Sequence, residues 1–166
     1  MDVSDVFKKR NFKNVNFKYE NLIGKNLSDA FLSGVDLNGA DIHNADLSGA
    51  DLSNAKLRGG ILFQVKFRGA DLRGADLRDA KIWDADMYGV DMRGADLRGA
   101  DLFNTDLRSS DLSDTDLSGS YLKNNDFTGA TFDNTEFSNT KYDKKTINTI
   151  THKDSKLRLK NHGVLW

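Results

Sequence analysis

A large apolar residue occupies every fifth position of this chain from Phe12 to Tyr142, without a slip in register. From Ala30 onward a small side chain, such as Ala40, stands two residues before each of these central residues, and only Asn125 departs from this rule. Asp usually precedes the central residue, Ser or Arg usually follows it, and Gly, Asn or Asp usually closes the unit. A repeat sustained over so many units indicates a solenoid in which each unit builds the same piece of structure.

The residue type at each position predicts the path of the backbone. A large and a small side chain two residues apart point to the same side of an extended segment, so together they fill a narrow interior. Gly, Asn and Asp tolerate the conformations of tight turns, so each unit is expected to end in a corner. The chain has no proline, which fits a structure whose backbone N–H groups bond to the neighbouring coil.

The repeated unit A-D-L-x-x, as it stands at residues 70–74 and 95–99, resembles that of the pentapeptide-repeat family. The resemblance covers residues 12–142, and the start Arg10-Asn11-Phe12 is similar to that of cyanobacterial members. It implies an all-β fold, a right-handed quadrilateral β-helix of about seven coils, roughly 30–35 Å long at the usual strand spacing. The period of five, rather than six, excludes the left-handed hexapeptide helix of acyltransferases.

The sequence divides the chain into three parts. Residues 1–11 are expected to form an N-terminal cap with a short helix, residues 12–142 form the β-helix, and residues 143–166 form a C-terminal tail or cap. The tail is expected to be irregular, apart from the alternation at residues 156–160 that is typical of a half-buried strand. Both ends need covering, because an open end exposes core and unpaired backbone groups to water.

Composition restricts the classes of function. The chain has no cysteine, which excludes disulfides and thiolate metal sites. It shows neither a signal peptide nor a stretch long enough to span a bilayer, so we expect a cytoplasmic protein without a membrane partner. Residues 28–142 carry 12 lysines and arginines against 20 acids, an acidic balance that disfavours binding to nucleic acid.

On the fold that the resemblance implies, residues 20 apart stack into columns, so the outer surface can be drawn from the sequence. Three faces carry columns of aspartate beside columns of arginine, for example Asp51, Asp71 and Asp91 beside Arg73 and Arg93. Like charges about 5 Å apart repel by roughly 1 kcal/mol in water, and the arginines offset that repulsion. We therefore predict a self-neutralising surface on these faces, hereafter the Asp/Arg lattice.

The arginine columns stop before the aspartate columns do. The last coils therefore carry an excess of acids, which forms an alternative candidate surface: Asp111, Asp114, Asp116, Asp126, Asp133 and Glu136.

The fourth face breaks the charged pattern with outward apolar and aromatic residues. The candidate partner-binding residues, hereafter the aromatic strip, are His43, Ile61, Phe63, Trp83 and Phe103, with Tyr88 one face further on. Aromatic residues stacked outside a solenoid serve no folding need, and exposed patches of several hundred Å² tend to mark interaction sites. A competing interpretation is that the tail folds back and covers the strip with Leu157, Leu159 and Trp166.

Catalytic signatures are missing from the sequence. The three histidines lack acidic or cysteine companions at catalytic spacing, and paired aspartates of the form D-x-D arise from the repeat itself. Neither a nucleophile elbow nor a phosphate-binding glycine loop is present, and a solid interior of Leu and Ala leaves no cavity for a substrate. We expect a protein that is not an enzyme and uses no cofactor or metal.

These observations favour a non-catalytic protein–protein interaction or scaffold module that presents the aromatic strip to a partner of unknown identity. The resemblance implies an alternative, a DNA-mimic regulator that binds a type II topoisomerase and confers quinolone resistance. Family members of that kind dimerise through C-terminal coils with bulky central residues, and Phe127, Phe132, Phe137 and Tyr142 fit that description. A homodimer through these coils or through the aromatic face stays open, as does a purely structural solenoid whose tail covers the strip.

Overall fold

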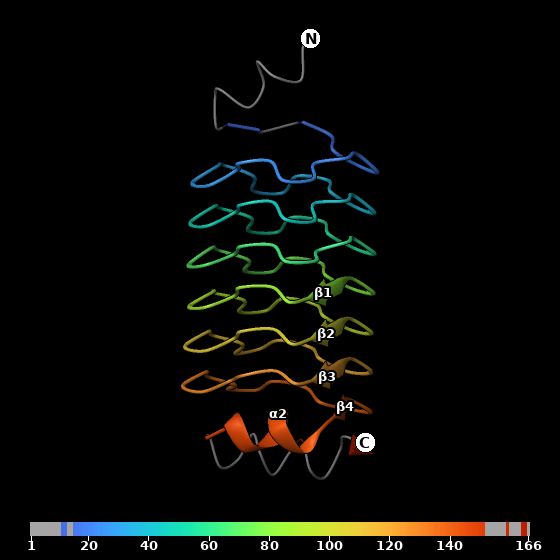
Figure 1. Ribbon diagram of the computed structural model, residues 1–166, viewed down its shortest axis with the longest axis vertical. Coiled ribbons are helices and arrows are strands. Elements are labelled where there is room, and N and C mark those ends of the chain that lie inside the picture. Colours follow the sequence, from blue (N-terminus) through green and yellow to red (C-terminus); the bar gives the residue numbers. More distant parts are fainter. Residues whose placement is uncertain (1–10, 13–14, 152–158, 160–163, 166) are drawn as a thin grey trace.

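The computed structural model describes residues 11–12, 15–151, 159 and 164–165. The predicted N-terminal cap therefore lies outside the described residues, apart from Asn11. The described chain is a right-handed quadrilateral β-helix whose coils stack along one long axis (Figure 1). Parallel bridges join residues 20 apart throughout, from Asn11 with Phe31 to Asp116 with Glu136, which confirms the predicted fold and coil length.

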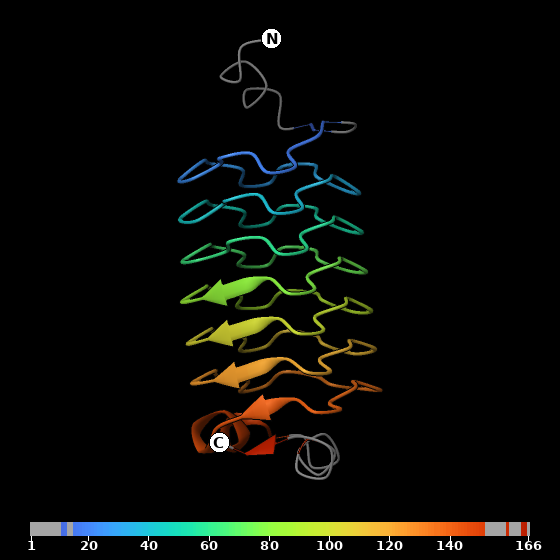
Figure 2. The ribbon, with the colours of Figure 1, turned by 90° about the vertical axis from the view of Figure 1, so that its right-hand side faces the viewer.

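One face of the β-helix carries longer strands than the others. It holds a parallel sheet, seen as stacked arrows in Figure 2. Its strands in order are β1 (Lys81–Trp83), β2 (Asp101–Phe103), β3 (Tyr121–Lys123), β4 (Lys141–Tyr142) and β5 (Val164–Leu165). The register sets Trp83 beside Phe103 and Phe103 beside Lys123, so this sheet bears the lower half of the aromatic strip.

The interior is filled by the central residues and the small residues that precede them. Every central residue from Phe12 to Tyr142 is at most 5% exposed. Backbone bonds tie each coil to the next, as where Leu72 N donates to Asp91 O at 2.7 Å and Asp91 N donates to Ala70 O at 3.1 Å. The predicted core is confirmed along the whole repeat.

The corners follow from the residue that closes each unit. From Tyr19 to Asn139 every such residue has a positive φ, whether it is glycine or not. In the usual unit the residue after the corner closes a turn, as where Ala75 N donates to Leu72 O at 3.0 Å. A positive φ at the third residue is the mark of a type II turn, and Gly, Asn and Asp adopt it most readily.

The C-terminal end corrects the expectation of an irregular tail. The chain leaves the last coil through helix α2 (Lys144–Thr149), which lies across the end of the β-helix (Figure 1). Asp143 is its N-cap and accepts a 2.8 Å bond from Thr146 N. The buried side chain of Ile147 lies on the inner face of the helix, so a helix covers apolar core that would otherwise meet water.

Helix α2 also supplies hydrogen-bond partners to the open backbone edge. Asn125 N donates to Thr146 Oγ1 at 3.0 Å, and Phe127 N donates to Thr149 Oγ1 at 2.9 Å. Unpaired N–H groups at the end of a solenoid are costly when buried. The physical reason for the helix is thus to complete the ladder as well as the core.

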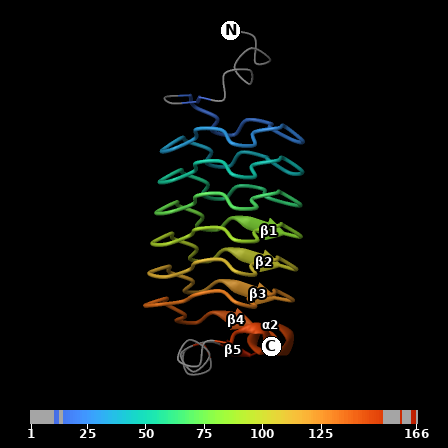
Figure 3. The ribbon, with the colours of Figure 1, turned by 90° about the vertical axis from the view of Figure 1, so that its left-hand side faces the viewer.

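Of the strand predicted at residues 156–160, all but one residue lie outside the described residues. Leu159, the described residue of that stretch, is helical and fully buried. Strand β5 then pairs with β4, setting Val164 beside Lys141, and Figure 3 shows it with α2 at the C-terminal end. Among the described residues, no helix is long and apolar enough to cross a membrane.

Candidate interaction surface

The aromatic strip is a continuous stack on the sheet face. The ring centroids of Phe63 and Trp83 lie 4.6 Å apart at an interplanar angle of 14°, so the two rings are stacked. Phe103 follows at 6.5 Å from Trp83 in an edge-to-face arrangement, and His43 lies 6.3 Å from Phe63 at the other end. The parallel register of β1 and β2 positions these side chains, because residues 20 apart point the same way.

The strip is less exposed than its sequence suggests. Phe63, Trp83, His43 and Ile61 are each half-buried, whereas Phe103 is 38% exposed. Stacked rings cover one another's faces, which leaves mainly ring edges in contact with solvent. The upper part of the strip is therefore a narrow ridge, and its open part lies at Phe103.

A hollow opens beside this exposed end of the strip. It has a volume of about 330 Å³ and is lined by Trp83, Asp101, Phe103 and Lys123. The indole Nε1 of Trp83 is buried and finds no acceptor in the described part of the chain. An unpaired buried N–H is costly, by about 1–3 kcal/mol, so its presence next to a hollow marks this end of the strip as the candidate site.

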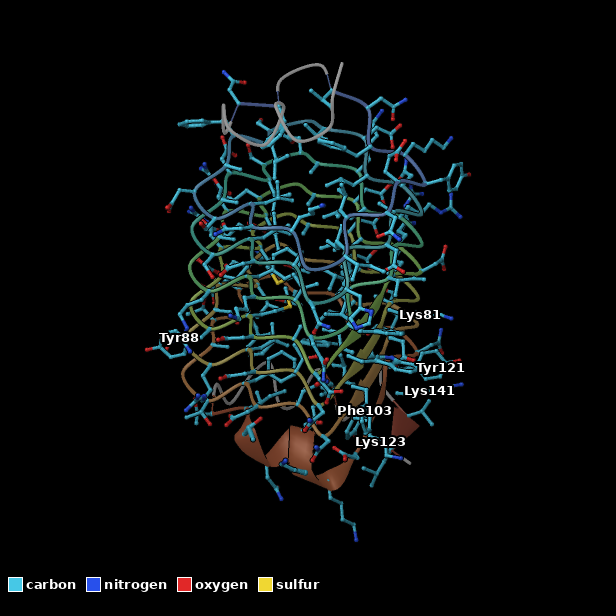
Figure 4. All side chains as sticks on the ribbon, turned by 45° about the horizontal axis from the view of Figure 1, so that its top comes forward. Lys81, Tyr88, Phe103, Tyr121, Lys123 and Lys141 are labelled. Carbon is cyan, nitrogen blue, oxygen red and sulfur yellow. The ribbon has the colours of Figure 1, made fainter. Side chains whose placement is uncertain are left out.

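Lysines flank the hollow on the same side of the molecule. Figure 4 shows Lys81, Lys123 and Lys141 on the side of Phe103 and Tyr121. Lys141 Nζ donates to Tyr121 Oη at 3.2 Å. Sequence reasoning overlooked Lys81 and Lys141. Both lie in the column of residues that directly precede the central residues, and the spacing of 20 that identified the aromatic strip also defines this column.

Tyr88 lies on another face than the strip, as the sequence predicted. It lies on another side of the molecule than Phe103 (Figure 4). Its ring packs between Arg68 and Arg108, whose guanidinium carbons lie 4.9 and 5.8 Å from the ring centroid. The physical reason is that the column of Tyr88 alternates with arginine, so its ring takes part in cation–π contacts within the Asp/Arg lattice.

The Asp/Arg lattice itself is confirmed. A typical arginine bridges two coils: Arg78 contacts Asp76 of its own unit at 2.6 Å and Asp96 of the next coil at 3.5 Å. The side-chain hydrogen bonds from Arg78 and Arg98 hold the pKa values of Asp76 and Asp96 below their usual range, against the opposing effect of burial. The carboxylates of Asp76 and Asp96 are thus matched by arginines within the chain.

The acidic coils at the C-terminal end are partly neutralised. Asp111, Asp116 and Asp126 lie 3.7, 3.7 and 4.0 Å from arginines of the preceding coil. Asp114 accepts a 3.1 Å bond from Asn134 Nδ2. Asp133 and Glu136 are exposed and, like Asp114, have no ion pair with any described residue, so these three acids keep unmatched charge.

Two exposed aromatic residues near the N-terminal end were also missed by sequence reasoning. Phe31 is 60% exposed and Tyr19 is 75% exposed. Phe31 replaces the aspartate that usually precedes a central residue, which was a readable signal. Tyr19 takes a corner position with a φ of 59°, and its ring lies over the Gly39 corner of the next coil.

Comparisons with known proteins agree with this architecture. Pentapeptide repeats, in eight copies, match residues 11–49, 21–59, 61–99 and 100–139, and the chain belongs to the pentapeptide-repeat family. A search of curated proteins returned no significant match.

Among solved structures, one similar chain is AT2G44920, a pentapeptide-repeat protein from the Arabidopsis thaliana thylakoid lumen, at 26% identity and a TM-score of 0.50, covering 86% of this chain and 81% of that one. A trypsin-treated form of QnrB1, a plasmid-mediated fluoroquinolone resistance protein, matches at 21% identity and a TM-score of 0.50, over 77% and 69% of the two chains. Rfr23 from the cyanobacterium Cyanothece 51142 matches at 21% identity and a TM-score of 0.40, over 81% and 99%.

Proposed function

We propose that this protein is a non-catalytic scaffold that presents the aromatic strip to a protein partner. The observation that carries the proposal is the stack of Phe63, Trp83 and Phe103 on the outside of a β-helix whose core is already closed. Interfaces are enriched in aromatic residues at their centres, and hot spots are enriched in Trp. Pentapeptide-repeat proteins are generally structural or interaction modules rather than enzymes, which is consistent with this role.

The fold does not require aromatic residues at the outer positions of the strip. Beneath it, Leu62, Ile82 and Leu102 fill the core as their counterparts do under the other faces, each with 0% exposure. Backbone hydrogen bonds join successive coils on the other faces as well. Because the other faces carry charged residues at the equivalent outer positions, the aromatic identity at this face points to a partner.

The tail offers limited cover to the strip in the described part of the chain. Leu159 is buried in the core cluster, and β5 extends the sheet beyond β4 instead of lying over β1 and β2. Phe103 keeps 38% of its surface exposed. The other two residues of the covering hypothesis, Leu157 and Trp166, lie outside the described residues.

A second candidate is mimicry of DNA toward a type II topoisomerase. The observation that favours it is the unmatched charge of Asp133 and Glu136 on the last coil. Against it, arginines neutralise Asp111, Asp116 and Asp126, and the likeness to QnrB1 at 21% identity concerns the fold alone. A supercoiling assay with purified gyrase tests this candidate, and the absence of inhibition or protection at micromolar protein excludes it.

Affinity capture from the lysate of the native host tests the proposed function. The wild type is compared with a strip variant, Phe63→Ser/Trp83→Ser/Phe103→Ser, and with a matched lattice variant, Arg73→Ser/Arg93→Ser. We expect a protein that the wild type and the lattice variant retain and that the strip variant loses, with unchanged β-sheet circular dichroism. Identical captures by all three proteins would contradict the proposed function.

A further inference from the structure

We infer that the segment that docks on the aromatic strip is acidic as well as apolar: an extended peptide whose Asp or Glu side chains meet the lysines around the hollow at Trp83 and Phe103. This inference rests on the proposed function and specifies the chemistry of the partner.

The arginines and the strip-side lysines differ in how their charge is matched. Every arginine from Arg58 to Arg108 forms an ion pair with an aspartate of the Asp/Arg lattice. On the strip side, Lys81 is exposed and has no ion pair with the described residues, and Lys141 bonds to the hydroxyl of Tyr121. Lys81 therefore leaves an unpaired positive charge on the strip side, in the same column as Asp101 of the hollow, whereas the arginines of the lattice are occupied.

The rings present edges rather than faces to a ligand. Phe63 and Trp83 are stacked at 4.6 Å with an angle of 14° along the axis of the β-helix, so each ring covers a face of the other. Nucleobases need a free aromatic face on which to stack, and these two rings do not offer one on their shared side. Ring edges carry the positive part of the aromatic quadrupole, which favours carboxylates close to the strip.

Two further features favour a short acidic peptide over a polyanion. Residues 28–142 hold 20 acids against 12 basic residues, so a long nucleic acid meets repulsion beyond the lysines. A short peptide meets Lys81, Lys123 and Lys141 against one acid in the lining of the hollow, Asp101. Trp83 also lines the hollow, and its Nε1 is buried without an acceptor among the described residues. A peptide carbonyl or carboxylate reaches this donor only if the indole turns toward the hollow.

Fluorescence anisotropy with labelled peptides of about eight residues, a length that spans the strip at about 3.3 Å per residue, tests the inference. The three probes share alternating Leu and Phe and differ only in the intervening residue, which is Glu, Gln or Lys. At about 0.15 M salt we expect the Glu peptide to bind at least about tenfold more tightly than the Gln peptide, since charge pairs add to complementarity. The Lys peptide is expected to show no binding.

Matched charge variants locate the binding. Lys81→Glu/Lys141→Glu should weaken the Glu peptide by about tenfold or more, whereas Lys56→Glu/Lys66→Glu, which makes the same charge change on other faces, should change its Kd by less than about twofold. Phe103→Ser should abolish binding of both the Glu and the Gln peptides. Unchanged melting of each variant shows that the comparison is made on folded protein.

The outcomes separate this inference from the proposed function. If the Gln or Lys peptide binds as tightly as the Glu peptide and Phe103→Ser removes that binding, the strip is a docking site, and the inference that its partner is acidic is wrong. If peptide binding survives Phe103→Ser, the proposed function fails as well. Tighter binding of a single-stranded DNA oligonucleotide, or self-association lost in Lys81→Glu/Lys141→Glu, would overturn the inference in favour of nucleic acid or a second copy.

Discussion

The Asp/Arg lattice and the aromatic strip are two surfaces of one repeating backbone. They differ in how many of their charged and polar groups find partners within the chain. In the lattice, Arg98 contacts Asp96 at 2.5 Å and Asp116 of the next coil at 3.7 Å, so this arginine forms ion pairs both within its own coil and with the next. On the strip, Phe103 remains 38% exposed, and the indole N–H of Trp83 has no acceptor among the described residues. The same scaffold thus carries one surface that is complete and one that is not.

This difference shows where the information in a solenoid resides. The interior and the corners are set by the repeat and are nearly identical around the coil, so they distinguish one face from another only weakly. The outward positions are free of these constraints, since a Ser, an Arg or a Phe there leaves the backbone ladder intact. A departure from the lattice pattern at these positions therefore points to function more directly than any residue of the core.

The largest expected effects lie in the core and should be equal beneath the two surfaces. Leu62 lies under the strip and Leu72 under the lattice, and both have 0% exposure. We expect Leu62→Ala and Leu72→Ala each to lower the free energy of unfolding by about 2–5 kcal/mol, as measured by urea denaturation. A cost at Leu62 much larger than that at Leu72 would show that the strip takes part in folding and would break the comparison.

A smaller effect is expected at Asn125, the polar residue beneath the sheet face. Its Oδ1 accepts from Thr105 N at 2.9 Å, and its Nδ2 donates to Leu102 O at 2.9 Å, with no exposure to solvent. Asn125→Ala leaves two buried backbone groups without partners and should cost about 1–3 kcal/mol in the free energy of unfolding.

The matched control for Asn125 is Thr115→Ala under the lattice, because Thr115 Oγ1 donates to Met92 O alone, at 3.0 Å. We expect the control to cost about 1 kcal/mol. Equal costs for the two variants would contradict the role assigned to the Asn125 amide.

The lattice, unlike the strip, should make stability depend on acid. The Arg108 hydrogen bonds hold the pKa of Asp106 below its usual range, as Arg78 does for Asp76. Because these pKa values are lower in the folded state, the stabilisation is present above the unfolded pKa of about 3.9 and is lost as the pH falls through the folded values. Urea denaturation from about pH 5 downward should show that loss.

Replacing arginines of the lattice should make the acid loss shallower. We expect Arg78→Gln/Arg108→Gln to reduce the dependence of the free energy of unfolding on pH in this range, while Lys81→Gln on the strip side leaves it unchanged. The same dependence in all three proteins would show that the ion pairs of the lattice do not stabilise the fold.

The sequence predicted the β-helix well because one constraint repeats. A central residue such as Leu72 must point inward and a corner such as Asn54 must take a positive φ, and both are confirmed. The C-terminal end was harder, since the repeat no longer applies after Tyr142. The N-cap Asp143 and the inward Thr146 of α2 were readable, but their partners lie in the previous coil, about twenty residues earlier.

The candidate site was predicted in its position but not in its detail. The spacing of 20 placed Phe63, Trp83 and Phe103 in one stack, which the ring distances confirm. How far the rings cover one another depends on their side-chain rotamers, which the spacing of residues in the sequence does not predict. The position of Tyr88 one face further on was also predicted, but its contacts with Arg68 and Arg108 depend on rotamers in the same way.

The central claim is that the strip serves a partner and not the fold, and β2 offers two adjacent residues that test it. Leu102 points inward with 0% exposure and Phe103 points outward. The measurement is the free energy of unfolding of Leu102→Ala and Phe103→Ser by urea denaturation. The account predicts a loss of about 2–5 kcal/mol for Leu102→Ala and a change within about 0.5 kcal/mol for Phe103→Ser. A loss at Phe103 comparable to that at Leu102 would contradict it and make the strip a structural element.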